Sequence, residues 1–177
     1  KPLASGAVIA PCVPGDEADL GPAAMTDYFC ELPAERGRFV DNALLFTCDG
    51  ACRSKIGISP MRSKDVVGSY DPDTGTLTVV KFNLPVAASD LPYVNSLWEM
   101  QNAPFGGDVI NSYNDGEVEP GAGQLGPFYE IETSSPAAEV APGGSVAHVS
   151  ATMHLSGDRD KIVAIAQAVF GVDLAKI

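Results

Sequence analysis

Two glutamates stand two residues apart in the segment FYEIET, residues 128–133. A β-strand turns alternate side chains to opposite faces, so Tyr129 and Ile131 share one face while Glu130 and Glu132 share the other. Paired carboxylates are residues that can serve as a proton-transferring base. The pattern indicates acid–base chemistry at this face or, as the ordinary alternative, the wet outer face of a half-buried strand.

Other residues of the chain offer the remaining groups that a sugar-processing site needs. Amides and arginines bind hydroxyl groups, and aromatic rings pack against the apolar side of a sugar ring. The candidates are Arg53, Asn95, Asn111 and Asn114 for the hydroxyl groups, and Tyr93, Trp98 and Tyr113 for the ring. Trp98 is the only tryptophan, and a core position is its ordinary alternative. Asn111, Tyr113 and Asn114 lie in a long glycine-rich stretch, residues 102–127, of the kind that often carries function.

Charge and motifs exclude several classes of function. The formal net charge of −12 repels nucleic acid and anionic lipid, and no apolar run approaches the ~18 residues of a membrane span, so we expect neither partner. No serine hydrolase elbow, phosphate-binding loop or dinucleotide fingerprint is present, so no cofactor is expected. His148 and His154 would lie roughly 20 Å apart along one strand, too far to share a metal.

The length of 177 residues suits one domain, and 18 Gly and 14 Pro residues can form the turns between many short strands. We predict a mainly β, antiparallel β-sandwich over residues 1–177, with residues 1–35 as an irregular covering segment. Strands are expected within 38–48, 52–58, 66–70 and 75–85. Only near the C-terminus does the apolar period become 3.6, which predicts one helix over 158–170. Its apolar stripe would contain Ile162, Ala166, Val169 and Phe170.

The four cysteines stand at positions 12, 30, 48 and 52, with intervals that do not suit a zinc site. The Asp49-Gly50 turn signal predicts that Cys48 and Cys52 face each other across a hairpin as a disulfide, which leaves Cys12 to pair with Cys30. Free, buried thiols are the alternative. The even count favours an oxidising, extracytoplasmic location, either periplasmic or secreted.

Several segments resemble one known family. They are DGACRSKIGIS, YVNSLWEMQ, the stretch from GGDVINSYNDG to HLSGD, and the closing helix. They look like the C-terminal part of a family of uncharacterised, mostly exported bacterial proteins with a galactose-mutarotase-like β-supersandwich fold, and the likeness covers most of residues 45–174. The resemblance implies a partial supersandwich, export from the cytoplasm, and an upstream half-domain of a longer precursor as a partner.

A more distant resemblance links EIETSSPAAEVAPGGSVAH to the aldose 1-epimerases. Their late strand reads apolar-Leu-Glu-Thr, and a proline-rich stretch and a turn then lead into the last long strand. The resemblance implies that Glu132 is the general base and that Glu130 modulates it. Epimerases also use a histidine acid from an earlier half of the sandwich, and His148 does not align with it. We therefore expect a carbohydrate-associated protein that binds or acts on a sugar or, alternatively, a non-catalytic glycan-binding or structural module.

Overall fold

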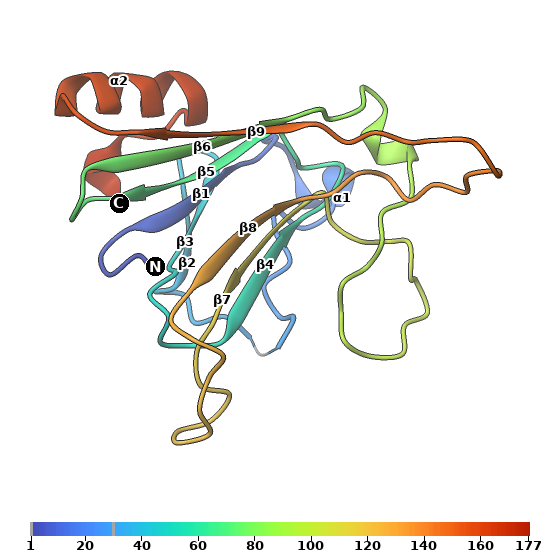
Figure 1. The fold of residues 1–177 in the computed structure, drawn as a ribbon, viewed down its shortest axis with the longest axis horizontal. Helices are drawn as coiled ribbons and strands as arrows, with labels where there is room; N and C mark the ends of the chain where they lie inside the picture. The colour runs from blue at the N-terminus through green and yellow to red at the C-terminus, as the bar shows by residue number, and fades with distance from the viewer. Residues whose placement is uncertain (1, 30) are drawn as a thin grey trace.

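The computed structural model describes residues 2–29 and 31–177, and in these residues nine strands form two antiparallel sheets (Figure 1). One sheet has six strands in the order β2-β3-β1-β5-β6-β9, and the other has three in the order β4-β7-β8. The strands are β1 (Ala7–Pro11), β2 (Gly37–Val40), β3 (Ala43–Phe46), β4 (Ser54–Ile58), β5 (Val66–Asp71), β6 (Thr76–Phe82), β7 (Ile110–Asn114), β8 (Tyr129–Thr133) and β9 (Ser150–Leu155). The predicted mainly β, antiparallel, sandwich-like fold is confirmed.

The first hydrophobic core lies between the two sheets. Ile56 and Ile58 of β4 and Ile110 of β7 pack in one cluster with Val8 and Phe46 of the larger sheet, and all five are fully buried. Because side chains alternate along a strand, the neighbours of these residues point to the other side of the three-stranded sheet. That side, which we call the outer face, faces away from the core and carries the polar residues described below.

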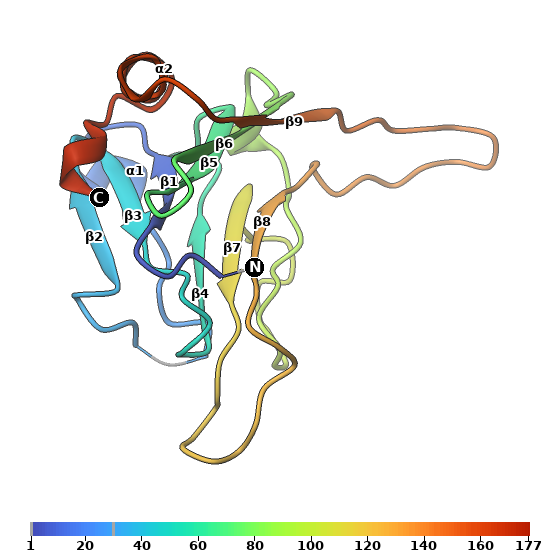
Figure 2. The same cartoon turned by 60° about the vertical axis from the view of Figure 1, so that its left-hand side comes forward.

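The second core lies between the six-stranded sheet and α2 (Arg159–Phe170) (Figures 1 and 2). Ile162, Ala166 and Phe170 are buried there, which confirms the predicted helix and most of its apolar stripe. Val169 is 36% exposed, so its place in the predicted stripe is wrong. The helix begins where Asp158 accepts hydrogen bonds from two backbone N–H groups, and it ends at Gly171 in the left-handed conformation.

The N-terminal segment is less irregular than predicted. β1 lies between β3 and β5 in the six-stranded sheet, and all five of its residues are buried. One of its faces packs in the first core and the other in the second, so the strand lacks the polar–apolar alternation by which a half-exposed strand is recognised. The prediction of an irregular segment over residues 1–35 is therefore wrong for β1, and also for the short helix α1 (Glu17–Leu20).

The predicted disulfide between Cys48 and Cys52 is also wrong, because both thiols are free. β3 and β4 flank the Asp49-Gly50 turn, but they belong to different sheets, so this connection crosses the sandwich and does not close a hairpin. Cys48 is buried near Ser112, with its Sγ atom 3.9 Å from the hydroxyl oxygen, while Cys52 is half-buried. The predicted pairing of Cys12 with Cys30 falls on Cys30, which lies outside the described residues.

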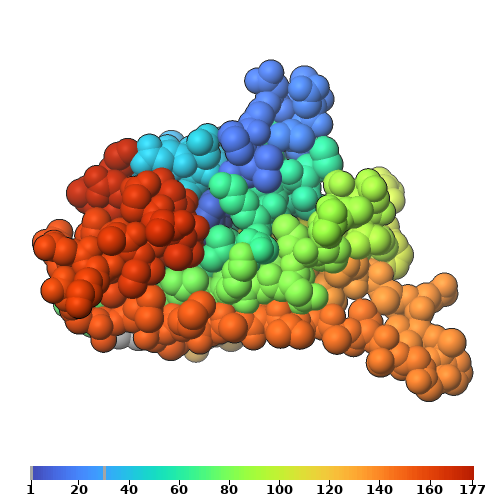
Figure 3. Space-filling model, turned by 90° about the horizontal axis from the view of Figure 1, so that it is seen from above, coloured from blue at the N-terminus to red at the C-terminus, as the bar shows by residue number. Residues whose placement is uncertain are grey.

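Residues 134–149 connect β8, at the edge of the small sheet, to β9, at the edge of the large one. This segment projects well beyond the body of the sandwich in the ribbon views and in the space-filling view (Figures 1, 2 and 3).

Two short 3-10 turns, Ala88–Asp90 and Leu174–Lys176, complete the elements described. Within residues 2–29 and 31–177, no helix is both long and apolar enough to cross a membrane.

Candidate functional site

Strand register brings the two glutamates together with residues of two other strands on the outer face. Lys55 of β4 pairs with Tyr113 of β7, and Tyr113 pairs in turn with Glu130 of β8. In the next row, Asn111 of β7 pairs with Glu132. The two glutamates therefore share one face, as alternation along the strand predicts, and a lysine reaches the same face from the far edge of the sheet.

A cavity of about 250 Å³ opens over these rows, and we call it the glutamate cavity. Its lining combines both glutamates, two cations and a set of aromatic and apolar side chains: Phe29, Arg53, Lys55, Ser96, Trp98, Tyr113, Leu125, Phe128, Glu130 and Glu132. A second hollow of about 480 Å³ adjoins it and shares Arg53, Trp98, Tyr113 and Leu125. Of the residues predicted from the sequence, Glu130, Glu132, Arg53, Trp98 and Tyr113 are thus brought together.

Trp98 is not a core residue, because 83% of it is exposed. Its ring packs edge-on against Phe29, with the centroids 6.2 Å apart, and Phe29 packs in the same way against Tyr113 at 5.8 Å. The guanidinium carbon of Arg53 lies 4.2 Å from the Phe29 ring centroid and 5.4 Å from that of Trp98. The cavity therefore has an aromatic wall with a cation held against it.

Lys55 forms the ion pair of the site. Its Nζ atom lies 3.3 Å from Oε1 and 3.4 Å from Oε2 of Glu132. The Lys55 side chain is 11% exposed and that of Glu132 is 37% exposed, so the pair closes one end of the cavity while the carboxylate stays accessible. In the described part of the chain, the carboxylate of Glu130 makes neither an ion pair nor a hydrogen bond, and the residue is exposed.

A buried polar cluster adjoins the Lys55–Glu132 end of the cavity on the same face of the sheet. The Tyr28 hydroxyl donates to Asp108, and Asn111 donates to the Tyr28 oxygen at 3.0 Å and to the Ile56 carbonyl at 3.2 Å. Burial raises the pKa of Asp108, although the hydrogen bond from Tyr28 and the positive charge of Lys55 oppose the rise. Burial also raises the pKa of Tyr28, and the charge of Asp108 raises it further. The cluster packs beside Lys55 and does not line the cavity.

Gly57 lets this cluster pack against β4. A Cβ atom at this position would lie 2.0 Å from Oδ2 of Asp108 and 2.7 Å from the Tyr28 hydroxyl. Such distances are not tolerated, so the close approach requires glycine.

Four predicted binding residues lie away from the cavity. Asn111 belongs to the buried cluster, and Tyr93 is fully buried in the first core. Asn114 follows Tyr113 on β7, so alternation turns its side chain to the opposite, buried side of the sheet. There it accepts a hydrogen bond from the Gly50 N–H at 2.8 Å and donates one to the Cys52 carbonyl at 2.6 Å. Asn95 accepts from the N–H of Leu97 at 3.1 Å and so stabilises a turn.

Neither histidine reaches the glutamates. The Nε2 atom of His148 lies 3.0 Å from the Thr133 hydroxyl, and the Nδ1 atom of His154 lies 3.0 Å from that of Thr78. Across residues 2–29 and 31–177, no group of three or more His, Cys, Asp or Glu residues is arranged to hold a metal ion.

Sequence reasoning missed several lining residues, among them Phe29, Lys55, Ser96, Leu125 and Phe128. Lys55 follows Arg53 by two positions, so the alternation that joined the glutamates was also a signal for this pair. Phe29 comes from a loop distant in sequence, and its position depends on tertiary packing alone.

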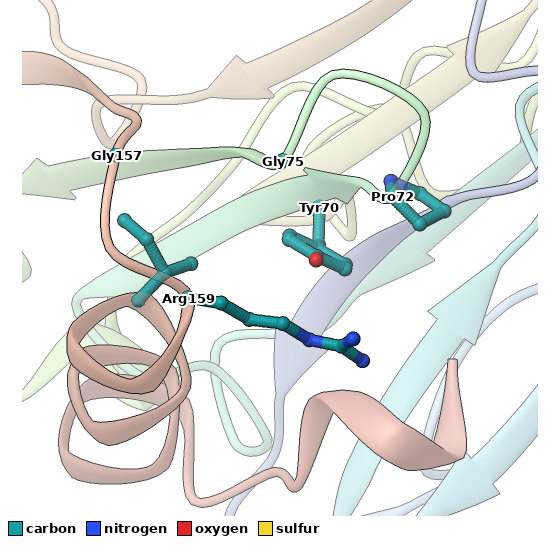
Figure 4. Close-up of a pocket in the computed structure, with 6 residues that line it drawn as sticks. Tyr70, Pro72, Gly75, Gly157 and Arg159 are labelled. Atoms are coloured by element: carbon teal, nitrogen blue, oxygen red, sulfur yellow. The ribbon is translucent and has the colours of Figure 1, made fainter.

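A different hollow, of about 250 Å³, lies at the start of α2, where Arg159 extends near Tyr70 and Pro72 (Figure 4). Gly75, Gly157 and Ile162 complete its lining, which holds no carboxylate to act as a base. The glutamate cavity is therefore the better candidate for chemistry.

Searches of the curated proteins and of the solved structures found no significant match. One protein family does match, over residues 1–177. The chain belongs to this family, the family of unknown function DUF6786.

Proposed function

We propose that this protein binds a saccharide in the glutamate cavity, as a carbohydrate-associated protein related to the aldose 1-epimerases. The observation that carries the proposal is the joint lining of one cavity by Glu130, Glu132 and an aromatic wall with Trp98 at its exposed edge. Aromatic faces pack against the C–H side of a sugar ring, and carboxylates and cations bind its hydroxyl groups. The galactose-mutarotase-like fold remains part of this proposal and rests on the resemblance of sequence.

The proposed reaction is interconversion of anomers. Glu132 takes the proton of the anomeric hydroxyl, the bond between the anomeric carbon and the ring oxygen breaks, and the ring oxygen gains a proton from an acid. Lys55 is the candidate acid. The anomeric hydroxyl oxygen and the ring oxygen are bonded to the same anomeric carbon, so an acid must lie close to the base, and the Lys55 ammonium lies 3.3 Å from Glu132. Closure of the open chain on the other face of the aldehyde gives the second anomer and returns both protons.

A non-catalytic glycan-binding module is the second candidate function. Two observations favour it: the lining of the glutamate cavity contains no histidine, and Glu132 is already engaged by Lys55. In this case the aromatic wall and Arg53 hold the sugar, and no proton transfer follows.

Titration with a panel of monosaccharides by NMR or calorimetry tests the shared part of the proposal. Trp98→Ala is expected to weaken binding about tenfold or more, since stacked aromatic residues dominate such contacts. The matched control is Phe39→Ala, which removes a half-exposed aromatic ring from β2. Absence of binding by every sugar, or equal effects of the two variants, would overturn the proposal.

Anomer exchange measured by NMR separates the two candidates. Glu132→Gln keeps the shape of the side chain and removes the base, so exchange is expected to fall by ~10² or more while binding survives. Glu139→Gln, on the exposed 134–149 segment, is the control for the loss of one negative charge. Binding without acceleration of exchange in the unaltered protein would assign the glycan-binding function.

We also propose that the protein acts outside the cytoplasm and packs against an upstream half-domain. The support is the resemblance to exported proteins. Cys48 and Cys52 are free thiols, so they give no evidence for an oxidising compartment. Fractionation of cells that express the natural gene, followed by the intact mass of the product, tests both statements.

A further inference from the structure

We infer that the saccharide bound in the glutamate cavity carries an anionic group, a carboxylate or a phosphate, and that Arg53 binds this group. The inference rests on the proposed function, and it adds the class of ligand. It follows from Arg53, which forms no salt bridge with the described residues although the protein carries a net charge of −12.

Arg53 differs from the other buried or half-buried cations of the described residues in the partners it has. Lys55 is paired with Glu132, and Arg36 is paired with Asp49 at 2.6 Å. Arg62 donates to the carbonyl oxygens of Val13, Gly15 and Gly21. Arg53 forms no salt bridge with any residue that the structure describes, although it is half-buried and lines both adjoining hollows.

Asp115, which lines the second hollow with Arg53, is already satisfied by other donors. Its carboxylate accepts from the Tyr113 hydroxyl at 2.7 Å and from the N–H of Gly126 at 2.9 Å. Burial raises the pKa of Asp115, but these hydrogen bonds outweigh it and hold the pKa below its usual value. Asp115 is thus engaged by these donors. Arg53 interacts with the Tyr113 hydroxyl, and a guanidinium has five N–H donors, so others remain available to a ligand.

The surroundings of Arg53 suit recognition of a planar or tetrahedral anion. Phe29 and Trp98 hold the guanidinium by its charge, at 4.2 and 5.4 Å from their ring centroids, and neither ring is a hydrogen-bond acceptor of the ordinary kind. A guanidinium presents paired N–H donors that match the oxygens of a carboxylate or a phosphate. A carboxylate or phosphate on the ligand would give Arg53 the direct salt-bridge partner that it lacks among the described residues.

The spacing of the two ends of the cavity indicates where the anionic group sits on the sugar. Arg53 precedes Lys55 by two residues on the same face, roughly 7 Å along the strand, and Lys55 is the residue that contacts Glu132. The base and the cation thus line the same cavity. An anion on the exocyclic carbon, at the end of the ring away from the anomeric carbon, can reach Arg53 while the anomeric hydroxyl faces Glu132.

The test compares three forms of the same hexoses: glucose and galactose, glucuronate and galacturonate, and the two 6-phosphates. Dissociation constants are measured by calorimetry at low and high salt for the unaltered protein, for Arg53→Gln and for Arg159→Gln. Arg159, in the hollow at the start of α2, is the control for the loss of one positive charge. Circular dichroism and thermal unfolding establish that each variant is folded.

We expect at least one anionic form to bind about tenfold or more tightly than its neutral parent, with the advantage reduced by salt. Arg53→Gln should abolish this advantage, so that the anionic forms lose about tenfold or more affinity beyond any loss shown by the neutral sugars, while Arg159→Gln should change neither. Preference for uronates identifies a carboxylate as the anion, and preference for 6-phosphates identifies a phosphate.

Two results would overturn the inference. If neutral sugars bind as tightly as anionic ones, or if Arg53→Gln weakens all of them equally, Arg53 only supports the aromatic wall, and the proposed saccharide site stands without this inference. If no sugar of any form binds, the proposed function fails as well.

Discussion

The ammonium of Lys55 lies 3.3 Å from Oε1 of Glu132, although the two residues sit on the opposite edges of a three-stranded sheet. The lysine side chain crosses β7 to make this contact, and it passes within 5.5 Å of the Tyr28 ring centroid. The charge of Lys55 therefore acts both on the proposed base and on the buried cluster of Tyr28 and Asp108.

Replacement of Lys55 by Met tests this double role. The change keeps an unbranched side chain and removes the proposed acid, so anomer exchange should fall by ~10² or more while sugar affinity changes little. Lys81→Met is the matched control, because Lys81 forms an exposed ion pair with Asp65 on the six-stranded sheet. Unchanged exchange in Lys55→Met would remove Lys55 from the proposed reaction.

A methyl group at Gly57 should disturb the packing of β4 against the buried Tyr28–Asp108 cluster and so destabilise the protein. The new Cβ atom would overlap Oδ2 of Asp108 at 2.0 Å, and relief requires a shift of the strand or of the carboxylate. We expect Gly57→Ala to lower the free energy of unfolding by about 1–3 kcal/mol, as overpacking does. Denaturant unfolding monitored by fluorescence measures the change.

Gly106→Ala is the control for this prediction. Its Cβ atom would meet Ala103 at 3.5 Å, an ordinary contact, so little loss of stability is expected. Equal losses in the two variants would show that the close approach to Asp108 is not the cause.

The buried carboxyl of Asp108 should make stability depend on pH. Its pKa is raised by burial in the folded protein, so between the unfolded value of about 3.9 and the higher folded value the native state holds more protons than the unfolded state. Stability contributed by this group is therefore present at low pH and is lost as the pH rises through the folded pKa.

Asp108→Asn removes the titration and keeps an oxygen that accepts from Tyr28. The free energy of unfolding of the variant, relative to the unaltered protein, should increase as the pH rises through that window, and should then stay constant. A difference that is independent of pH would contradict the raised pKa of Asp108. The comparison is made by urea unfolding at a series of pH values.

The cysteines should differ in reactivity, since thiolates are the reactive form. Burial raises the pKa of Cys12 to about 11 and that of Cys48 further still, whereas Cys52 is only half-buried. In the native protein at neutral pH, iodoacetamide should modify Cys52 well before Cys12 or Cys48. Peptide mass spectrometry over time measures the order, and a bridged Cys48–Cys52 peptide in unreduced protein would contradict the free thiols.

Local features of this protein could be predicted from the sequence because they depend on the geometry of a single element. The period of two put Glu130 and Glu132 on one face of β8, and the period of 3.6 located α2 (Arg159–Phe170) within the predicted range 158–170. Turn residues separated β4, β5 and β6 as predicted, but the predicted segment 38–48 divides into β2 and β3 at Asp41 and Asn42, both with positive φ. The glycine-rich stretch 102–127, interpreted as a long loop, contains β7.

Features that depend on what covers a strand could not be predicted in this way. β1 is buried on both faces, so it lacks alternation and was taken for irregular chain. Asn111 and Asn114 are both polar residues of β7, yet one supports Tyr28 and the other binds the Gly50–Cys52 turn. Trp98 is exposed because the loop that carries it lies over the edge of the cavity.

By itself, the sequence determined the mainly β class, the closing helix and the shared direction of the two glutamates, because backbone periods are local. Only the tertiary structure decided that Lys55 pairs with Glu132, that Phe29 and Trp98 hold Arg53, and that Cys48 and Cys52 stay apart. These contacts join residues from different strands and loops. Their existence depends on strand order and register, which follow from burying the whole core at once and not from any one segment.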